Sequence, residues 1–231
     1  MNPVPIRRIY VWELPVRFYH WINAGSVAVL AVTGYFIGNP PAIQSAAEAY
    51  DSYWFGTLRF CHFVASFVFF FNFLFRLYWG FVGNRYARWD NFILVRPAKW
   101  REIIAVLKVD ILQVLRQPLT SAGHNALAGL TYFFMFLAFL FQAVTGFGMY
   151  AAMSKSWFPR LFAWIVPLMG GDFAVRQWHH MMMWFFIVFA MVHVYLVCYH
   201  DYVEGRGVAS SMVGGWKFVE EQPPSSDKRV S

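Results

Sequence analysis

Four long apolar runs, separated by polar segments, dominate the pattern of hydrophobic and polar residues along the chain. They cover residues 18–37, 58–82, 126–150 and 178–199. A helix needs about 20 mostly apolar residues to cross the hydrocarbon core of a bilayer, and each run is long enough. The first run is too long for the apolar part of a signal peptide, which has about 7–15 residues. The pattern therefore predicts four transmembrane helices.

The composition agrees with a membrane location. Of the 231 residues, 59% are hydrophobic and only 13% are charged, whereas soluble domains carry about 25% charged residues. So few charges could not cover the surface of a water-soluble protein of this size. We therefore expect an all-α integral membrane protein, a four-helix bundle that forms one membrane domain over residues 1–218. Residues 219–231, rich in Pro, Ser and charged residues, are expected to be a disordered tail.

Lysine and arginine indicate the orientation of the helices. If the N-terminus is cytoplasmic, the cytoplasmic segments carry 15 of these residues and the outer segments carry only 4. Cytoplasmic loops are enriched in Lys and Arg, so both termini are expected in the cytoplasm. The net charge of +7 is explained by this topology, and the scattered basic residues give no indication of nucleic acid binding.

Two polar loops contain segments with apolar character of their own. Residues 100–116 place apolar side chains at helical spacing with basic residues between them, which is typical of a helix lying in the headgroups or packed on the end of the bundle. Residues 151–175 are too short to span the membrane and are interrupted by Pro159 and Pro167. This second segment is expected at the interface or under a partner protein.

The two cysteines exclude several kinds of redox centre. Cys61 and Cys198 are expected near opposite membrane faces, so we expect no disulfide between them. The chain has no Cys-x-x-Cys-His motif, which excludes covalent attachment of c-type haem. Two thiolates are also too few for an iron–sulfur cluster held by four cysteines.

Four histidines within residues 176–200 raise the question of what they bind, because an ionisable side chain is costly in hydrocarbon. His179 and His193 are 14 residues apart. On a helix this separation is about 21 Å along the axis, and the two side chains point within about 40° of each other. His180 points about 140° away from His193. The geometry therefore favours His179, and His180 is interpreted as a packing or supporting residue.

Two further histidines lie where they could face this pair. His20 is at the cytoplasmic start of the first run, and His62 is at the outer start of the second. The depths of the residues predict two pairs, His62–His179 on the outer side and His20–His193 on the inner side. Each pair could hold one haem iron through neutral imidazole nitrogens. The alternative is that these histidines are hydrogen-bonded packing residues or members of a proton relay.

Arginine precedes three of the histidines by three residues. These arginines are Arg17, Arg59 and Arg176. Positions i and i+3 share a helix face, so each arginine could bind a haem propionate near the membrane surface. The alternative is that the arginines extend from the helix ends to the headgroups without binding a ligand.

Polar residues also gather at the cytoplasmic ends of the last two runs. His124 and Asn125 precede the third run, and His200 and Asp201 follow the fourth. They are candidates for binding a quinone carbonyl near the inner pair, or they cap helices.

One short pattern occurs twice. Val32-Thr33-Gly34-Tyr35 ends the first run and Val144-Thr145-Gly146-Phe147 ends the third. Small residues at such positions let helices or a flat ligand approach closely. Coincidence and a true repeat both remain open.

Six stretches of the chain form a recognisable set: residues 13–21 (ELPVRFYHW), 32–40 (VTGYFIGNP), 76–86 (RLYWGFVGNRY), 123–125 (GHN), 178–180 (WHH) and 211–213 (SMV). Through these stretches the sequence resembles, over about residues 10–218, the b-type cytochrome subunit of membrane-bound nickel–iron uptake hydrogenases. Ala126 departs from the pattern, in which proline would follow Gly-His-Asn. The histidine pattern alone is also similar to that of formate dehydrogenase gamma subunits and other dihaem cytochromes b.

The resemblance implies a specific function. The chain would anchor the small and large hydrogenase subunits at the periplasmic face of the bacterial inner membrane. It would carry two haems b on His20, His62, His179 and His193 and pass electrons from the iron–sulfur clusters of its partner to membrane quinone. Hydrogen cleavage would occur in the partner, because this chain lacks the cysteines to bind nickel. The alternatives are the cytochrome b of another quinone-linked dehydrogenase, a cytochrome b that acts alone on quinone, and a haem-free membrane anchor.

Overall fold

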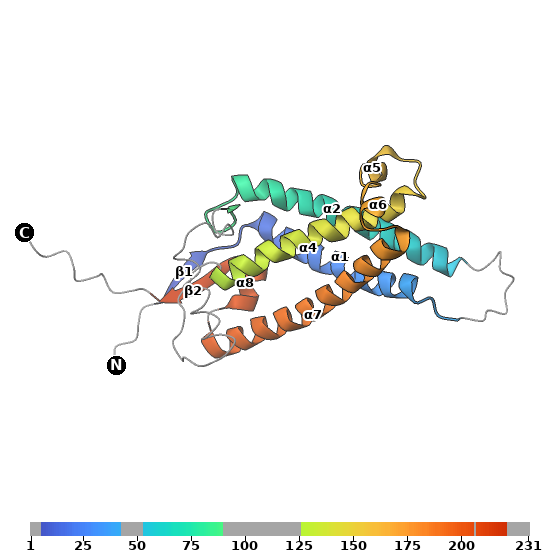
Figure 1. The fold of residues 1–231 in the computed structure, drawn as a ribbon. Coiled ribbons are helices and arrows are strands. Elements are labelled where there is room, and N and C mark those ends of the chain that lie inside the picture. Colours follow the sequence, from blue (N-terminus) through green and yellow to red (C-terminus); the bar gives the residue numbers. More distant parts are fainter. Residues whose placement is uncertain (1–5, 43–52, 90–125, 206, 221–231) are drawn as a thin grey trace, which may run out of the picture. The chain divides into compact units, whose positions relative to one another are not determined.

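The computed structural model describes residues 6–42, 53–89, 126–205 and 207–220 (Figure 1). The predicted helix at residues 100–116 and the quinone candidates His124 and Asn125 lie outside the described residues. The elements in chain order are β1 (Ile6–Tyr10), α1 (Leu14–Gly38), α2 (Trp54–Val82), α4 (Ala126–Ala151), α5 (Trp157–Arg160), α6 (Ile165–Leu168), α7 (Asp172–Glu204), α8 (Val208–Gly214) and β2 (Trp216–Glu220).

The four predicted transmembrane helices are confirmed as helices long and apolar enough to cross a membrane. They are α1, α2, α4 and α7, and each of them extends beyond its apolar run at one or both ends. The helices continue past charged residues that precede the runs, for example through Arg17 in α1 and Arg176 in α7. Arginine is tolerated at such positions because its long side chain can reach the headgroup region while its stem lies along apolar surface.

The chain divides into two compact units, and the long helices contribute residues to both. The helical unit comprises residues 18–78 and 133–194. The strand unit comprises residues 1–17, 79–132 and 195–231, of which residues 90–125 and both chain ends are not described.

Aromatic packing forms the core of the helical unit. The main cluster brings together α2, α4 and α7, with α1 packed against it through Val27 and Leu30. Its buried members are Phe69, Phe73, Met135, Ala138, Phe139 and Phe186. The rings of Phe139 and Phe186 stack with centroids 5.1 Å apart. Lipid is as apolar as these side chains, so close packing between helices, rather than exclusion of water, holds such a bundle together.

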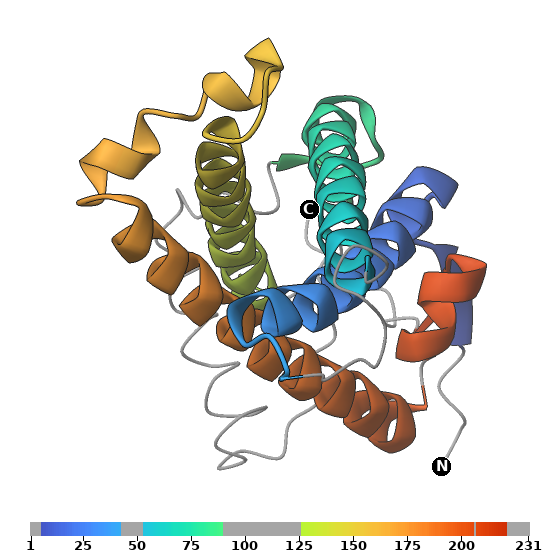
Figure 2. The same ribbon diagram turned by 90° about the vertical axis from the view of Figure 1, so that its right-hand side faces the viewer.

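The segment between α4 and α7 folds back on the bundle. It carries α5 and α6 and joins the ends of the two long helices (Figure 2). Phe158 and Phe162 pack against a second buried cluster formed by Phe70, Ala143 and Phe147. Trp157 and Trp164 of the same segment are more than half exposed, which suits either the membrane interface or a partner protein.

A two-stranded antiparallel sheet, which the sequence patterns did not predict, joins the two chain ends in the strand unit. β1 pairs with β2 in a register that runs from Ile6 opposite Glu220 to Tyr10 opposite Trp216. Val219, assigned above to a disordered tail, therefore belongs to a strand, as does Glu220. The fold is mostly helical, as expected, with this sheet added.

Motif residues hold the strand unit together. The Glu13 carboxylate accepts hydrogen bonds from Trp79 Nε1 at 3.0 Å and from the Asn84 backbone at 2.9 Å. Asn84 in turn donates to the Val11 carbonyl at 3.0 Å. Trp12 donates through Nε1 to Ser211 Oγ at 3.2 Å. The stretches quoted above for the family resemblance thus meet in three dimensions through polar contacts.

Removal of a ring from the main aromatic cluster is expected to destabilise the helical unit. Phe73 is 2% exposed, and Phe71 on the same helix is 59% exposed. Phe73→Ala leaves a cavity that should lower the free energy of unfolding by about 3 kcal/mol. Phe71→Ala, whose ring faces away from the core, is the matched control. Thermal unfolding in detergent measures both, and equal midpoints for the two variants would contradict the assigned core.

Candidate cofactor site

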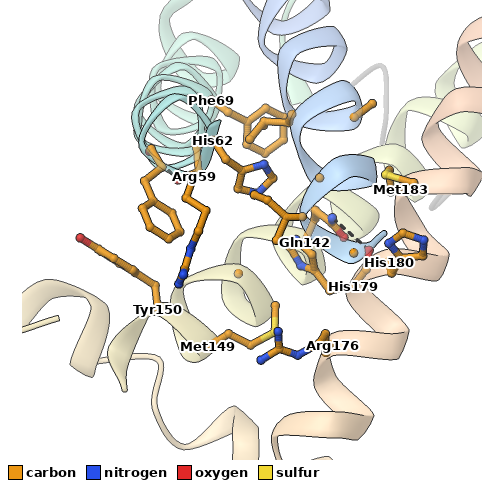
Figure 3. A pocket seen from close by; sticks show the side chains of 18 of the residues that line it. Arg59, His62, Phe69, Gln142, Met149, Tyr150, Arg176, His179, His180 and Met183 are labelled. Carbon is orange, nitrogen blue, oxygen red and sulfur yellow. Dashed lines mark hydrogen bonds between the residues drawn. The ribbon is translucent and has the colours of Figure 1, made fainter. Parts of the chain in front are cut away.

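A pocket of about 320 Å³ lies within the helical unit and is lined by α1, α2, α4 and α7. Figure 3 shows that Arg59 and His62 reach it from α2, while Arg176 and His179 reach it from α7. His180 also lines this pocket. The structure therefore brings together the two histidines of the predicted outer pair and two of the three candidate arginines.

The His62 ring is held by a threonine on a neighbouring helix. His62 Nδ1 lies 2.8 Å from Thr33 Oγ1 of α1. Thr33 is buried, and its hydroxyl also lies 2.6 Å from the Val29 carbonyl one turn earlier on α1. The imidazole is thus tied to the backbone of α1 through one hydroxyl group.

His179 is held in the same way from a different helix. Its Nδ1 lies 2.9 Å from Thr145 Oγ1 of α4, and Thr145 is fully buried. The Thr145 hydroxyl lies 2.8 Å from the Phe141 carbonyl. Gln142 donates to the backbone carbonyl of His179 at 3.2 Å, a bond drawn in Figure 3. Side chain and backbone of His179 are therefore both fixed against α4.

Each of these threonines is followed by a glycine that lies against the same imidazole. A Cβ atom placed on Gly34 would be 3.3 Å from Cε1 of His62, and one on Gly146 would be 3.1 Å from Cε1 of His179. Such contacts are tighter than those of ordinary side chains. The two imidazoles therefore rest almost directly on helix backbone. His180 lies against Gly38, where a Cβ atom would be 2.9 Å from its ring.

The two histidines of the predicted inner pair also face each other within the helical unit. The rings of His20 on α1 and His193 on α7 have centroids 6.3 Å apart and are inclined by 52°. His20 Nδ1 is buried and has no hydrogen-bond partner among the described residues. His193 is exposed and stacks on Phe189 with centroids 5.7 Å apart. This pair has no counterpart of the threonine contacts in the part of the chain that the structure describes.

The three candidate arginines differ in their partners. Arg176 pairs with Asp172 at 2.7 Å, and both side chains are more than half exposed. Arg59 contacts a thioether: its Nη2 atom lies 3.0 Å from Met153 Sδ. Arg17 belongs to the strand unit and donates to the Val213 carbonyl. Arg59 and Arg176 thus line the pocket of the helical unit. Arg17 belongs to the strand unit and is not among the residues that line this pocket.

The quinone candidates are not gathered into a site within the described residues. In the strand unit, Asp201 Oδ1 accepts from the Ala209 backbone at 3.3 Å, near the start of α8. This hydrogen bond is a helix-capping contact, which was the alternative to quinone binding in the sequence analysis. His200 packs against the Tyr199 ring at 5.6 Å.

Sequence reasoning missed the two threonines and Gln142 as neighbours of the histidines. A signal for the threonines was present, because Val-Thr-Gly occurs once in α1 and once in α4. Each copy lies beside a different imidazole in the folded chain, a contact between helices that the sequence pattern alone does not reveal.

Comparisons with known proteins support a single family. A family model described as "Prokaryotic cytochrome b561" matches residues 11–215. A protein of Azotobacter vinelandii named "Probable Ni/Fe-hydrogenase B-type cytochrome subunit" is 43% identical over 94% of this chain and 91% of its own length. A protein of the same name from Cupriavidus necator is 42% identical over 94% of this chain and 89% of its own length. The "Probable Ni/Fe-hydrogenase 1 B-type cytochrome subunit" of Escherichia coli K12 is 35% identical over 90% of each chain.

Addition of one methyl group at Gly146 is expected to disturb His179. Gly146→Ala places a Cβ atom 3.1 Å from the ring, and rotation of the ring out of its preferred conformation costs about 1 kcal/mol. Haem b affinity should then fall about fivefold. Gly25→Ala on α1, which meets nothing within 4 Å, is the control. The haem b retained by each purified variant measures the effect, and equal retention would show that the glycine is not needed for the site.

Proposed function

We propose a function that starts from one established fact: the chain belongs to the prokaryotic cytochrome b561 family. We infer that it is the membrane cytochrome b subunit of a nickel–iron hydrogenase complex. In this role it holds two haems b and passes electrons from the hydrogenase to membrane quinone. Relatives named as hydrogenase cytochrome subunits align with at least 90% of the chain, which supports this proposal.

The observation that carries the proposal is the presence of two imidazole pairs in one helical unit. His20 and His193 face each other with centroids 6.3 Å apart. Two metal–nitrogen bonds of about 2 Å each, added to the half-widths of two five-membered rings, give a separation of about 6 Å. The inner pair therefore fits an iron ion held between two imidazoles.

The outer pair fits a flat ligand for a different reason. His62 and His179 line the same pocket from α2 and α7. Gly34 and Gly146 remove the side chains that would otherwise occupy the space beside each ring. Small residues at these positions let each imidazole ring lie close to helix backbone, which fixes where the two rings present their nitrogens. The shared pocket of the outer pair and the facing rings of the inner pair support axial histidine ligation, the way in which haem is held in many proteins.

The residues have separate tasks in this proposal. Haem b, when bound, supplies one-electron redox chemistry that no amino-acid side chain of this chain offers. The four histidines hold it, and the surrounding phenylalanines keep water away and lower the local dielectric. Redox potential depends on these two factors, ligation and burial.

Among the arginines, Arg59 is best suited to bind a carboxylate such as a haem propionate. Among the described residues its partner is a thioether, a weak, neutral acceptor that supplies no counter-ion for the guanidinium. Arg176 already has Asp172 as a counter-ion, although both are exposed and such a surface pair is weak and easily exchanged. We therefore assign Arg59 the first role and Arg176 the second, and Arg17 remains a candidate for the inner pair.

The direction of electron transfer follows from the proposed orientation. With both termini in the cytoplasm, His62 and His179 lie on the periplasmic side of the bacterial inner membrane. The hydrogenase small and large subunits would dock there, beside the α5–α6 segment and its exposed Trp157 and Trp164. Quinone would be reduced on the cytoplasmic side, for which His124, Asn125, His200 and Asp201 stay candidates.

Alanine substitution of His179 and of His180 distinguishes a haem ligand from a residue that only lies beside it. His179→Ala is expected to lower the haem b content of the purified chain from two per chain to one, because it removes an axial nitrogen. His180→Ala is expected to leave two haems, since the ring lies against Gly38 and not against Thr145. The pyridine haemochrome assay gives the stoichiometry. Equal loss in both variants would contradict the assignment, and no haem b in the native chain would refute the proposed function.

A change in the inner pair should interrupt the same electron path at its other end. His193→Ala is expected to lose one haem b and to abolish hydrogen-driven reduction of a quinone analogue in membranes. Hydrogen-driven reduction of an artificial dye by the hydrogenase subunits should persist, because their iron–sulfur clusters are untouched. Co-purification of the native chain with a different dehydrogenase would instead support another quinone-linked complex.

A further inference from the structure

The two imidazoles of the outer pair are supported by the same local device. In each case a threonine hydroxyl lies within 2.9 Å of the histidine Nδ1 atom and within 2.8 Å of the carbonyl four residues before the threonine. The threonines belong to α1 and α4, whereas the histidines belong to α2 and α7. Two independent pairs of helices thus produce one arrangement.

The positions of the oxygen atoms determine where the protons lie. Thr33 Oγ1 is 2.6 Å from the Val29 carbonyl oxygen, and a carbonyl can only accept a hydrogen bond. Two oxygens at that distance attract only when a proton lies between them. The hydroxyl therefore donates to the carbonyl, as threonine often does within a helix. The hydroxyl oxygen then accepts a hydrogen bond from the N–H group at Nδ1 of His62. The same reasoning applies to Thr145, the Phe141 carbonyl and His179.

A neutral imidazole carries one proton. When Nδ1 holds it, Nε2 has the free lone pair and is the atom available to a metal. We propose that Thr33 and Thr145 are positioning residues, which fix His62 and His179 as Nδ1-protonated tautomers with Nε2 available to bind iron. This inference rests on the proposed function, because it presupposes that the outer pair holds haem.

The glycine that follows each threonine completes the support. Cε1 lies between the two ring nitrogens, and Cε1 is the atom that approaches Gly34 in His62 and Gly146 in His179. The hydroxyl holds one nitrogen while the bare backbone limits rotation of the ring about that bond. The repeated Val-Thr-Gly is therefore a local structural solution used twice, once for each ligand of the outer pair.

The device is absent from the described surroundings of His20, whose buried Nδ1 has no hydrogen-bond partner there. A hydrogen bond from Nδ1–H raises the basicity of a ligating imidazole. A more basic ligand stabilises oxidised iron more than reduced iron, and this lowers the midpoint potential. The two threonines should therefore lower the potential of the outer haem and leave that of the inner haem unchanged.

Valine replaces threonine with nearly the same shape and without the hydroxyl. In the native complex with its partner subunits, Thr33→Val and Thr145→Val are each expected to raise the midpoint potential of one of the two haems. A tenfold preferential loss of affinity for the oxidised state, the lower end of the effect typical of residues that support metal ligands, corresponds to about 59 mV. A redox titration followed by visible absorption measures the shift, and the low-spin electron paramagnetic resonance signal of the same haem should change with it.

Two kinds of control isolate the hydroxyl. Thr33→Ser and Thr145→Ser keep it and should restore the native potential and spectrum. Thr57→Val removes a threonine on α2 that makes the same kind of bond to a carbonyl, at 3.2 Å from Tyr53, without any histidine contact. This variant should behave as the native protein. If the valine variants do not accumulate in the membrane, the serine variants decide, and a shifted potential in them overturns the inference.

The outcomes separate the two proposals. Native potentials in Thr33→Val and Thr145→Val, with two haems b bound, would overturn the positioning role and leave the proposed function intact. A shift of equal size in Thr57→Val would also overturn it, since the effect would then not depend on the histidine contact. A native complex without haem b would instead refute the function on which the inference rests.

Discussion

A neutral imidazole in the interior of a membrane protein needs a partner for its N–H group, because neither lipid nor apolar side chains can supply one. An unpaired polar group there costs several kcal/mol, about as much as the whole net stability of many domains. The hydrogen bonds from His62 to Thr33 and from His179 to Thr145 meet this need without adding a charge to the bundle. They also leave the opposite nitrogen of each ring unprotonated. One constraint, the satisfaction of a buried N–H group, thereby determines which atom of the histidine is available for chemistry.

The aromatic core makes these bonds possible. A hydroxyl on one helix can reach an imidazole on another only when the two helices have one fixed rotation and separation. The stacked and edge-on contacts of Phe69, Phe139 and Phe186 supply this restraint on α2, α4 and α7. Phenylalanine has few rotamers and no polar atoms, so it packs in a defined way without competing for the histidines. Phenylalanine makes up 26 of the 231 residues. Its packing between the helices helps to fix the positions of the two histidine pairs.

The sequence was sufficient for the helices, because hydropathy is a property local to one helix. The choice of His179 over His180 as a haem ligand also rests on the geometry of one helix, and it stays a prediction. Hydropathy located all four spans, and helical geometry preferred His179 to His180, which the structure places against different neighbours. The threonine contacts could not be predicted in the same way. Thr33 and His62 lie on separate helices, and their meeting depends on packing between helices that no periodicity reveals. The β1–β2 pairing was missed because each strand has only five residues and its partner lies about 200 positions away in the chain.

In the proposed function, the difference between the two histidine pairs would connect local hydrogen bonding to the direction of electron transfer. Electrons that entered beside a periplasmic partner and left to quinone on the other side would be helped along if the outer haem had a lower potential than the inner haem. If the two pairs hold haem as proposed, hydrogen bonds from His62 and His179 would lower the potential at the outer pair. Nδ1 of His20 has no hydrogen-bond partner among the described residues, so the inner pair would lack this effect. If the hydrogen bonds supported both pairs equally, they would produce no difference in redox potential between the two haems. Within the described part of the chain, the two hydroxyl groups support the outer pair and none supports the inner pair. In the proposed function this difference would give a nearly symmetric set of histidines a direction.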